Sequence, residues 1–158
     1  MAIAVSTPGS GGVPYNAPLG AGYESGVNAA GGVSVVKVTG LSSDVITTAT
    51  NLLTAYNGDI EILNIILETG STGFATSTNI QVLTDNAYGG ANILVETRAN
   101  LSANVTVDLN TASVTKQRTV IEQNKHLQIN CTGSNSTGAG TWRLYVEYRP
   151  LVPGASLA

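Results

Sequence analysis

The sequence predicts an all-β fold, an antiparallel two-sheet sandwich of jelly-roll type with an extended N-terminal arm. Proline cannot donate a hydrogen bond to a β-ladder, and the prolines lie only toward the two ends of the chain, at Pro8, Pro14, Pro18, Pro150 and Pro153. The proline-free stretch between them alternates apolar and polar residues in short runs separated by polar turns. No segment carries a convincing helical pattern. A closed barrel is the second choice for this pattern.

The first half of the proline-free region begins with a strand at residues 33–39, which Gly40 is expected to stop. Residues 52–56 and 60–69 follow, joined by Asn57-Gly58, and Asn-Gly between two apolar runs is a strong hairpin signal. We therefore expect these two strands to pair. The second of them carries apolar residues on both parities, as a central strand or a strand with a bulge would.

The second half reads as further alternating strands. They are expected at residues 79–84, 91–98, 105–109, 114–122, 126–131 and 142–149. The last one is the most regular, with Trp142, Leu144, Val146 and Tyr148 on one face, and it ends at Pro150. The chain thus divides into an extended Gly/Pro-rich arm at 1–32, a β-sandwich domain at 33–151 and a short C-terminal tail at 152–158.

The arm is the unusual segment. It holds eight glycines and three prolines, and its only charged residue is Glu24. A disordered tail usually carries more charge, so this composition suits a segment that lies along another protein surface. Proline lowers the ordering cost of such an arm, and tyrosine is a good anchor for a partner surface. The predicted partner-binding residues are Pro8, Pro14, Tyr15, Pro18, Leu19 and Tyr23.

The charge pattern argues against several classes of partner. The formal net charge is −3 and the seven Lys and Arg residues are scattered, so we expect no nucleic-acid partner. The N-terminus lacks the charged and apolar regions of a signal peptide, and no apolar run approaches a membrane span, so we expect no membrane partner. Only 11% of residues are charged, which suggests that part of the surface is covered in the working state.

Catalytic and metal-binding patterns are weak. One cysteine and one histidine fall short of a zinc site, so we expect no metal and no other cofactor. His126 lies on the polar face of its strand and is predicted to be exposed and inert, whereas Cys131 lies on the apolar face and is predicted to be buried. Asp59 and Asp85 are predicted to be turn residues rather than calcium ligands. We therefore expect no catalytic residue and no enzyme, although two distant carboxylates could still meet as a glycosidase pair.

Sugar binding is the main alternative from another functional class. Trp142 and six tyrosines could stack on sugars, as in a lectin-like sandwich. Trp142 and Tyr148 share an apolar face and are predicted to be core residues instead. An exposed tyrosine such as Tyr88 or Tyr145 would then have to carry the stacking.

Two stretches resemble a known class of virion protein. Residues 140–151, Gly-Thr-Trp-Arg-Leu-Tyr-Val-Glu-Tyr-Arg-Pro-Leu, resemble the closing strand of small structural proteins on tailed-phage heads, and Pro153-Gly154-Ala155-Ser156 is similar to their short tail. Residues 53–60 are similar to their first hairpin. The resemblance covers about half of the chain and leaves the arm unmatched.

The resemblance implies a head decoration, or cement, protein of the β-sandwich type. Such a bacteriophage protein is made in the host cytoplasm and located in the virion, on the outer capsid surface. It binds the major capsid protein, often as a homotrimer, and its function is capsid stabilisation. The long arm leaves open a head-fibre base or a tail-associated protein, and a carbohydrate-binding host-attachment module remains the alternative.

Overall fold

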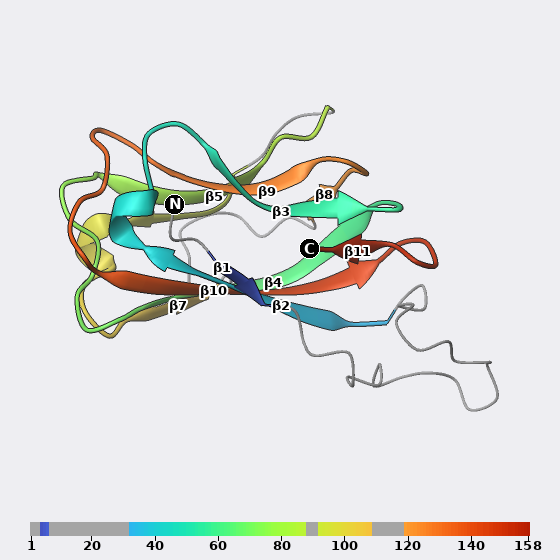
Figure 1. Cartoon of the computed structure of the whole chain (residues 1–158), viewed down its shortest axis with the longest axis horizontal. Helices are drawn as coiled ribbons and strands as arrows, with labels where there is room; N and C mark the ends of the chain where they lie inside the picture. Colours follow the sequence, from blue (N-terminus) through green and yellow to red (C-terminus); the bar gives the residue numbers. More distant parts are fainter. Residues whose placement is uncertain (1–3, 7–31, 88–91, 109–118) are drawn as a thin grey trace.

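The computed structural model places two antiparallel β-sheets face to face (Figure 1). It describes residues 4–6, 32–87, 92–108 and 119–158. The strands are β1 (Ala4–Ser6), β2 (Ser34–Leu41), β3 (Thr50–Tyr56), β4 (Ile60–Thr69), β5 (Asn79–Thr84), β6 (Asn92–Thr97), β7 (Thr106–Asp108), β8 (Thr119–Ile121), β9 (His126–Cys131), β10 (Thr141–Pro150) and β11 (Ser156–Leu157). Two single-turn 3₁₀ helices, η1 (Ser42–Asp44) and η2 (Arg98–Asn100), lie in loops.

The strand order is that of a jelly roll. One sheet runs β1-β2-β10-β4-β7, with β8 also on β4, and the other runs β11-β3-β9-β5-β6. The pairs are nested, because β2 pairs with β10, β3 with β9, β4 with β7 and β8, and β5 with β6. This is the arrangement obtained by rolling up one long hairpin, and it confirms the predicted sandwich of jelly-roll type.

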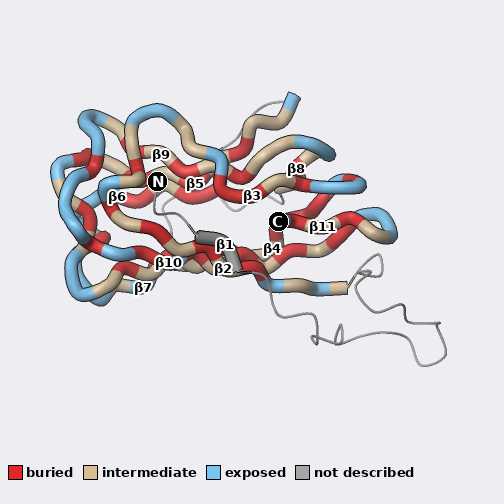
Figure 2. The backbone as a smooth tube through the Cα atoms, in the orientation of Figure 1, coloured by how far each residue is buried: buried red, intermediate tan, exposed pale blue. Residues whose placement is uncertain are grey.

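The core lies between the two sheets and is built from alternate strand positions (Figure 2). In β9 and β10 the buried residues follow the predicted parity along the whole strand. Trp142 is 1% exposed, and its indole Nε1 donates a hydrogen bond to the carbonyl of Leu41 at 2.9 Å. The prediction that Trp142 and Tyr148 are core residues is therefore confirmed.

Strand β4 is paired on both edges and contains a bulge, and the bulge explains its apolar residues on both parities. Its register with β10 runs from Ile62 opposite Tyr148 to Asn64 opposite Glu147, so Leu63 is an extra residue. Ile60 and Ile62 are buried before the bulge, and Ile65 and Leu67 are buried after it. The bulge shifts the alternation by one residue and keeps both halves of the strand facing the core.

The predicted hairpin between residues 52–56 and 60–69 is wrong. The turn is present, with Asn57 at φ 58° and Gly58 at φ 147°, but it carries the chain from one sheet to the other. Strand β4 pairs with β10 along nearly its whole length and with β7 and β8 on its other edge, so it has no edge left for β3. Strand β3 pairs with β9 and β11 instead.

Two further local predictions need correction. Gly40 does not stop its strand but lies inside β2, directly opposite Trp142. A Cβ atom at Gly40 would lie 2.5 Å from Cζ2 of that indole, so glycine is required there by the close approach of the ring. The sequence also did not predict β11, which pairs with β3 and buries Ala155 and Leu157 at the C-terminal end of the chain.

Candidate interaction surfaces

The predicted partner-binding residues of the arm, Pro8, Pro14, Tyr15, Pro18, Leu19 and Tyr23, lie outside the described residues. The part of the arm that the structure describes is β1, which pairs antiparallel with β2, with Ala4 opposite Thr39 and Ser6 opposite Lys37. The beginning of the arm therefore adds a strand to the edge of the sandwich. Strand addition of this kind satisfies backbone groups that an edge strand otherwise presents to solvent or to partners.

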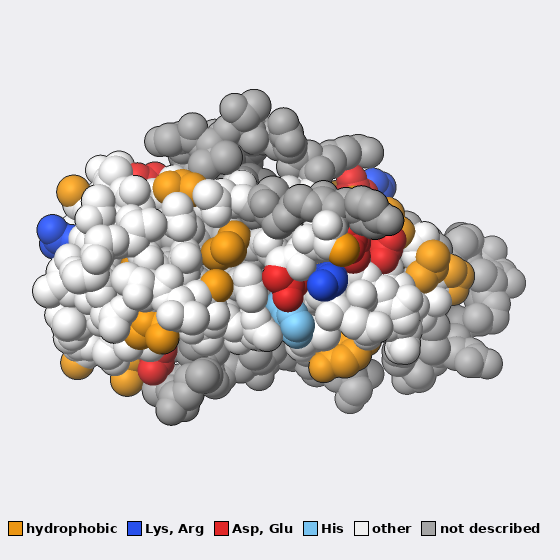
Figure 3. Space-filling view, turned by 90° about the horizontal axis from the view of Figure 1, so that it is seen from above, with side chains coloured by type: hydrophobic (Ala, Val, Ile, Leu, Met, Phe, Trp, Pro, Cys, Tyr) orange, Lys and Arg blue, Asp and Glu red, His pale blue; other side chains and the backbone are white. Residues whose placement is uncertain are grey.

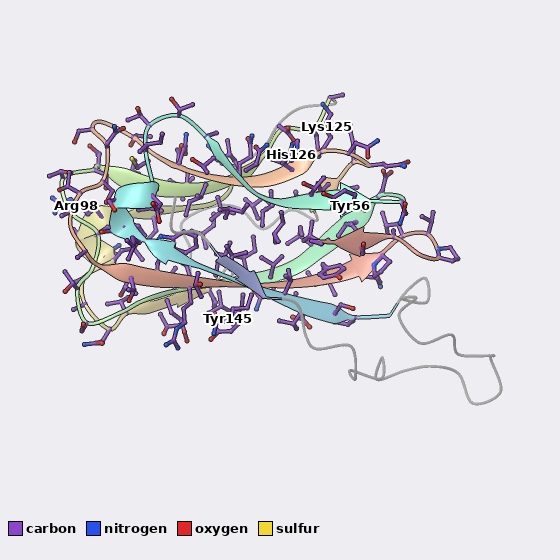
Figure 4. The ribbon with its side chains drawn as sticks, viewed as in Figure 1. Tyr56, Arg98, Lys125, His126 and Tyr145 are labelled. Carbon is purple, nitrogen blue, oxygen red and sulfur yellow. The ribbon has the colours of Figure 1, made fainter. Side chains whose placement is uncertain are left out.

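The outer face of the β2-β10-β4 sheet carries most of the paired charges. The ammonium of Lys37 lies 5.9 Å from the ring centroid of Tyr145, a cation–π contact, and Tyr145 points away from the other sheet (Figure 4). Nε of Arg149 donates to Oε2 of Glu61 at 2.9 Å, and this carboxylate is only 4% exposed. On this face, Lys37, Glu61 and Arg149 therefore each contact another side chain.

An open pocket of about 470 Å³ lies where β4 ends and β10 begins. Its lining combines hydroxyls and an amide with one cation and one carboxylate, contributed by Glu68, Thr69, Gly70, Ser71, Asn104, Thr106, Thr141, Trp142 and Arg143. The two charged groups approach to 3.9 Å. The indole in the wall is almost fully buried, so it offers no exposed ring face for stacking a sugar. Of the two tyrosines named for that role, Tyr145 is half-buried and Tyr88 lies outside the described residues.

His126 is neither isolated nor fully exposed, which corrects the expectation for this residue. Asp85 accepts hydrogen bonds from its backbone N–H at 2.6 Å and lies 2.7 Å from its ring Nδ1. Figure 3 shows this only histidine of the chain beside acidic and basic side chains. Burial raises the pKa of the Asp85 carboxyl, but the hydrogen bonds and charge of His126 outweigh it and hold that pKa below its usual value.

The Asp85–His126 pair links the segment after β5 to the start of β9, and it does not form part of a catalytic triad. In the part of the chain that the structure describes, no hydroxyl or thiol hydrogen-bonds to the imidazole. The neighbouring Asn86 accepts from the backbone N–H of Glu122 at 3.1 Å, and Glu122 accepts from the N–H of Ala87 at 3.0 Å. These bonds attach the segment that follows β5 to the turn between β8 and β9.

Cys131 is buried, as predicted. It is 1% exposed, its Sγ lies 3.3 Å from the carbonyl of Val45, and burial raises the pKa of the thiol. Among the described residues, no three His, Cys, Asp or Glu side chains come together to hold a metal ion. Asp59, which was predicted to be a turn residue, accepts a hydrogen bond from the backbone N–H of Gln123 at 2.8 Å. Within the same residues, no helix has the length and apolarity needed to cross a membrane.

Comparison with known proteins finds likeness in structure alone. No family model matches the chain, and no curated protein matches it. Among solved structures, it is similar to a chain of the acidic stable capsid structure of Helicobacter pylori bacteriophage KHP30, at 15% identity and a TM-score of 0.53, covering 78% of this chain and 92% of that one. A chain of the cyanophage Pam1 capsid asymmetric unit matches at 19% identity and a TM-score of 0.46, covering 87% and 99% of the two chains.

Proposed function

We propose that this chain is a virion structural protein that decorates the outer surface of a phage capsid by binding the lattice of the major capsid protein. The observation that supports this most directly is the likeness to a chain of the KHP30 capsid structure, since the match covers 92% of that chain. The sandwich therefore corresponds to nearly the whole of a chain found in a phage capsid structure. The resemblance of residues 140–151 to head decoration proteins points the same way.

The mechanism is mechanical rather than catalytic. The sandwich sits on the shell, and the arm, residues 1–32, contacts an adjacent capsid protein through the residues that follow β1, while β1 itself stays paired with β2. The edge pairing of β1 with β2 shows that the arm forms β-structure against another strand. Copies associate as homotrimers, so each bound unit makes three linked contacts, and linked contacts bind far more tightly than single ones. Because the same contacts recur at every position of the capsid lattice, their summed binding energy stabilises the shell.

Co-sedimentation with capsids that lack this protein tests the proposal. Purified full-length protein is titrated onto such capsids, and the bound amount is measured at each concentration. We expect saturable binding at a fixed number of copies per shell, together with a higher temperature of shell disruption. Absence of binding, or binding that grows without saturation, would refute the decoration role.

A second comparison tests the arm. Tyr15 and Tyr23, which both lie outside the described residues, are changed together to Ala in the full-length chain, and thermal unfolding checks that the variant is folded. We expect at least tenfold weaker binding, the cost of losing two anchor side chains of roughly 1 kcal/mol or more each. Sedimentation equilibrium of the same samples measures the oligomeric state. A monomer at saturating concentrations would remove the trimer from the proposal.

A further inference from the structure

The pocket where β4 ends and β10 begins, the polar pocket, is built on a row of residues that crosses three neighbouring strands. Arg143 of β10 lies directly opposite Glu68 of β4, and Glu68 lies directly opposite Thr106 of β7. Side chains at directly opposite positions point to the same face of a sheet, so the three lie side by side. The pocket is at the end of the sandwich where β10 starts, at the left of Figure 1. The row presents a guanidinium, a carboxylate and a hydroxyl next to one another.

The rim of the polar pocket is held by backbone hydrogen bonds. The N–H of Gly70 donates to the carbonyl of Thr141 at 2.8 Å, and the N–H of Asn104 donates to the carbonyl of Gly70 at 2.8 Å. The hydroxyl of Thr69 accepts from the N–H of Val105 at 2.9 Å, which attaches the loop before β7 to the end of β4. A Cβ atom at Gly70 would clash with Oγ1 of Thr141, so these segments are closely packed. The rim is therefore ordered before a ligand arrives, which lowers the entropy cost of binding.

The polar pocket keeps hydrogen-bonding groups for a ligand. Within the described residues, the exposed side chains of its lining that form no hydrogen bond with the protein are Ser71, Asn104, Thr106 and Thr141. Hydroxyls and amides both donate and accept. Arg143 is 60% exposed, and its distance of 3.9 Å from the Glu68 carboxylate is too long for a direct hydrogen bond. Its guanidinium therefore has N–H groups that can donate to a ligand.

The lining favours a neutral ligand that carries several hydroxyls. The charges of Arg143 and Glu68 compensate each other, so the polar pocket has no net charge with which to select an anion or a cation. None of the exposed large hydrophobic residues of the described chain lines it, so it lacks the apolar anchors that a peptide or an apolar ligand uses. Its volume of about 470 Å³ is within the range of small-molecule sites. Adjacent hydroxyls of a sugar ring match a carboxylate, a guanidinium and an amide that lie side by side.

We propose that the polar pocket binds a neutral sugar residue of a surface glycan, through hydrogen bonds with Glu68, Asn104, Thr141 and Arg143. The buried indole of Trp142 allows no stacking, so a single site binds weakly, with a Kd of about 1 mM. This inference is independent of the proposed function, because the site is complete in one chain. On a shell coated with the protein, as the proposed function has it, many weak sites would act together and bind a glycan-bearing surface far more tightly than one site does.

Titration of the full-length protein with simple sugars tests the site. The probes are the methyl glycosides of glucose, galactose, mannose and N-acetylglucosamine, and saturation-transfer difference NMR detects which of them bind. Trp142 is the only tryptophan of the chain and lies in the pocket wall, so the single indole N–H resonance of isotope-labelled protein reports binding at this place. We expect at least one neutral glycoside to bind and to shift that resonance. Methyl glucuronide, which carries a carboxylate, is the charged comparison and should bind no more tightly.

Matched variants locate the binding. Asn104→Gly removes the amide and keeps a residue suited to the φ of 57° at this position. Asn124→Gly is its control, because Asn124 has a φ of 63° and its N–H also donates to a backbone carbonyl, but it lies in the turn after β8, at the other end of β4. We expect Asn104→Gly and Arg143→Met each to weaken sugar binding by about tenfold or more, and Asn124→Gly to bind within about twofold of the unchanged protein. Thermal unfolding shows that each variant is folded.

Three outcomes would overturn the inference. The first is that none of the neutral glycosides binds. The second is that methyl glucuronide binds more tightly than all of them, because the pocket would then select an anion. The third is that Asn104→Gly and Arg143→Met bind as the unchanged protein does, or that Asn124→Gly weakens binding as much as Asn104→Gly, since the sugar would then bind elsewhere. Because no capsid is present in these titrations, their failure is distinct from a failure of co-sedimentation, which would refute the proposed function alone.

Discussion

Gly40→Ala tests the packing that holds the two longest pairings of the sandwich in register. The added methyl carbon would lie 2.5 Å from Cζ2 and 2.8 Å from Cε2 of Trp142. The indole cannot turn aside, because it is buried and its Nε1 is hydrogen-bonded to Leu41. Overpacking of this kind costs about 2 kcal/mol of unfolding free energy, or about 8 °C in melting temperature for a domain of this size.

When the indole of Trp142 is removed, we expect Gly40→Ala to stabilise the protein instead of destabilising it. Trp142→Leu alone should cost about 3 kcal/mol, because it leaves a cavity and an unpaired carbonyl. In that background Gly40→Ala has room for its methyl group, and it restricts the unfolded chain, so it should stabilise by about 0.5 kcal/mol. The coupling energy of the double-mutant cycle is then about 2.5 kcal/mol.

Urea unfolding followed by far-ultraviolet circular dichroism measures all four proteins, since the double variant lacks the only tryptophan. If Gly40→Ala lowers the unfolding free energy equally with Trp142 and with Leu at that position, the steric argument is refuted. The destabilisation would then come from the backbone of β2 and not from a clash with the indole. A cost below about 0.5 kcal/mol in the unchanged background would refute it as well.

The remaining predictions concern buried or paired side chains. Asp85→Asn should cost about 1 kcal/mol at neutral pH. The pKa of the Asp85 carboxyl is lowered in the folded protein, so its contribution to stability is full above the ordinary value of 3.8 and is lost as the pH falls through the lower folded pKa. The unfolding free energies of the two proteins, measured by urea titration, should therefore converge only at pH values below 3.8. Glu61→Ala should cost about 2 kcal/mol, because its carboxylate is buried against Arg149, and Glu68→Ala less than about 0.5, because Glu68 is half-buried and lies 3.9 Å from the exposed Arg143. Equal costs would contradict this reasoning. The thiol of Cys131 should react with a disulfide reagent only at the rate of unfolding, and rapid reaction of the native protein would show that it is accessible.

The sequence predicts the sandwich well where strands alternate strictly. Strands β5, β9 and β10 lie within a residue of their expected bounds, because one face of each is buried and the other is not. The apolar residues on both parities of β4 indicated either a strand buried on two sides or a strand with a bulge, and the structure contains the bulge, since a one-residue insertion shifts the alternation without changing the composition.

Partner choice between strands could not be predicted from local signals. The turn at Asn57-Gly58 is present, yet its two strands belong to different sheets, because β10, β7 and β8 occupy both edges of β4. Pairings of this kind depend on residues far apart in the sequence. Strand β11 was missed for a related reason, because a strand of two residues has no periodicity to detect.

The interaction surfaces were predicted unevenly. The arm stays a prediction from composition, whereas the polar pocket at the end of β4 was not predicted, because Glu68, Asn104 and Arg143 come together only after folding. The contact of His126 with Asp85 was also missed, since it joins strand β9 to the segment after β5, and the spacing of two residues 41 positions apart does not encode such a contact.

The nested pairing of the strands has a consequence for how the protein is made. Strand β10 lies between β2 and β4, and Trp142 meets Gly40 in a pairing that spans most of the chain. Until β10 is synthesised, both of these strands present open edges, and such edges invite association with other chains. Contacts between distant parts of a sequence also form slowly. Only a finished chain can close the sandwich, so a fragment that ends before β10 should aggregate instead of joining an assembly.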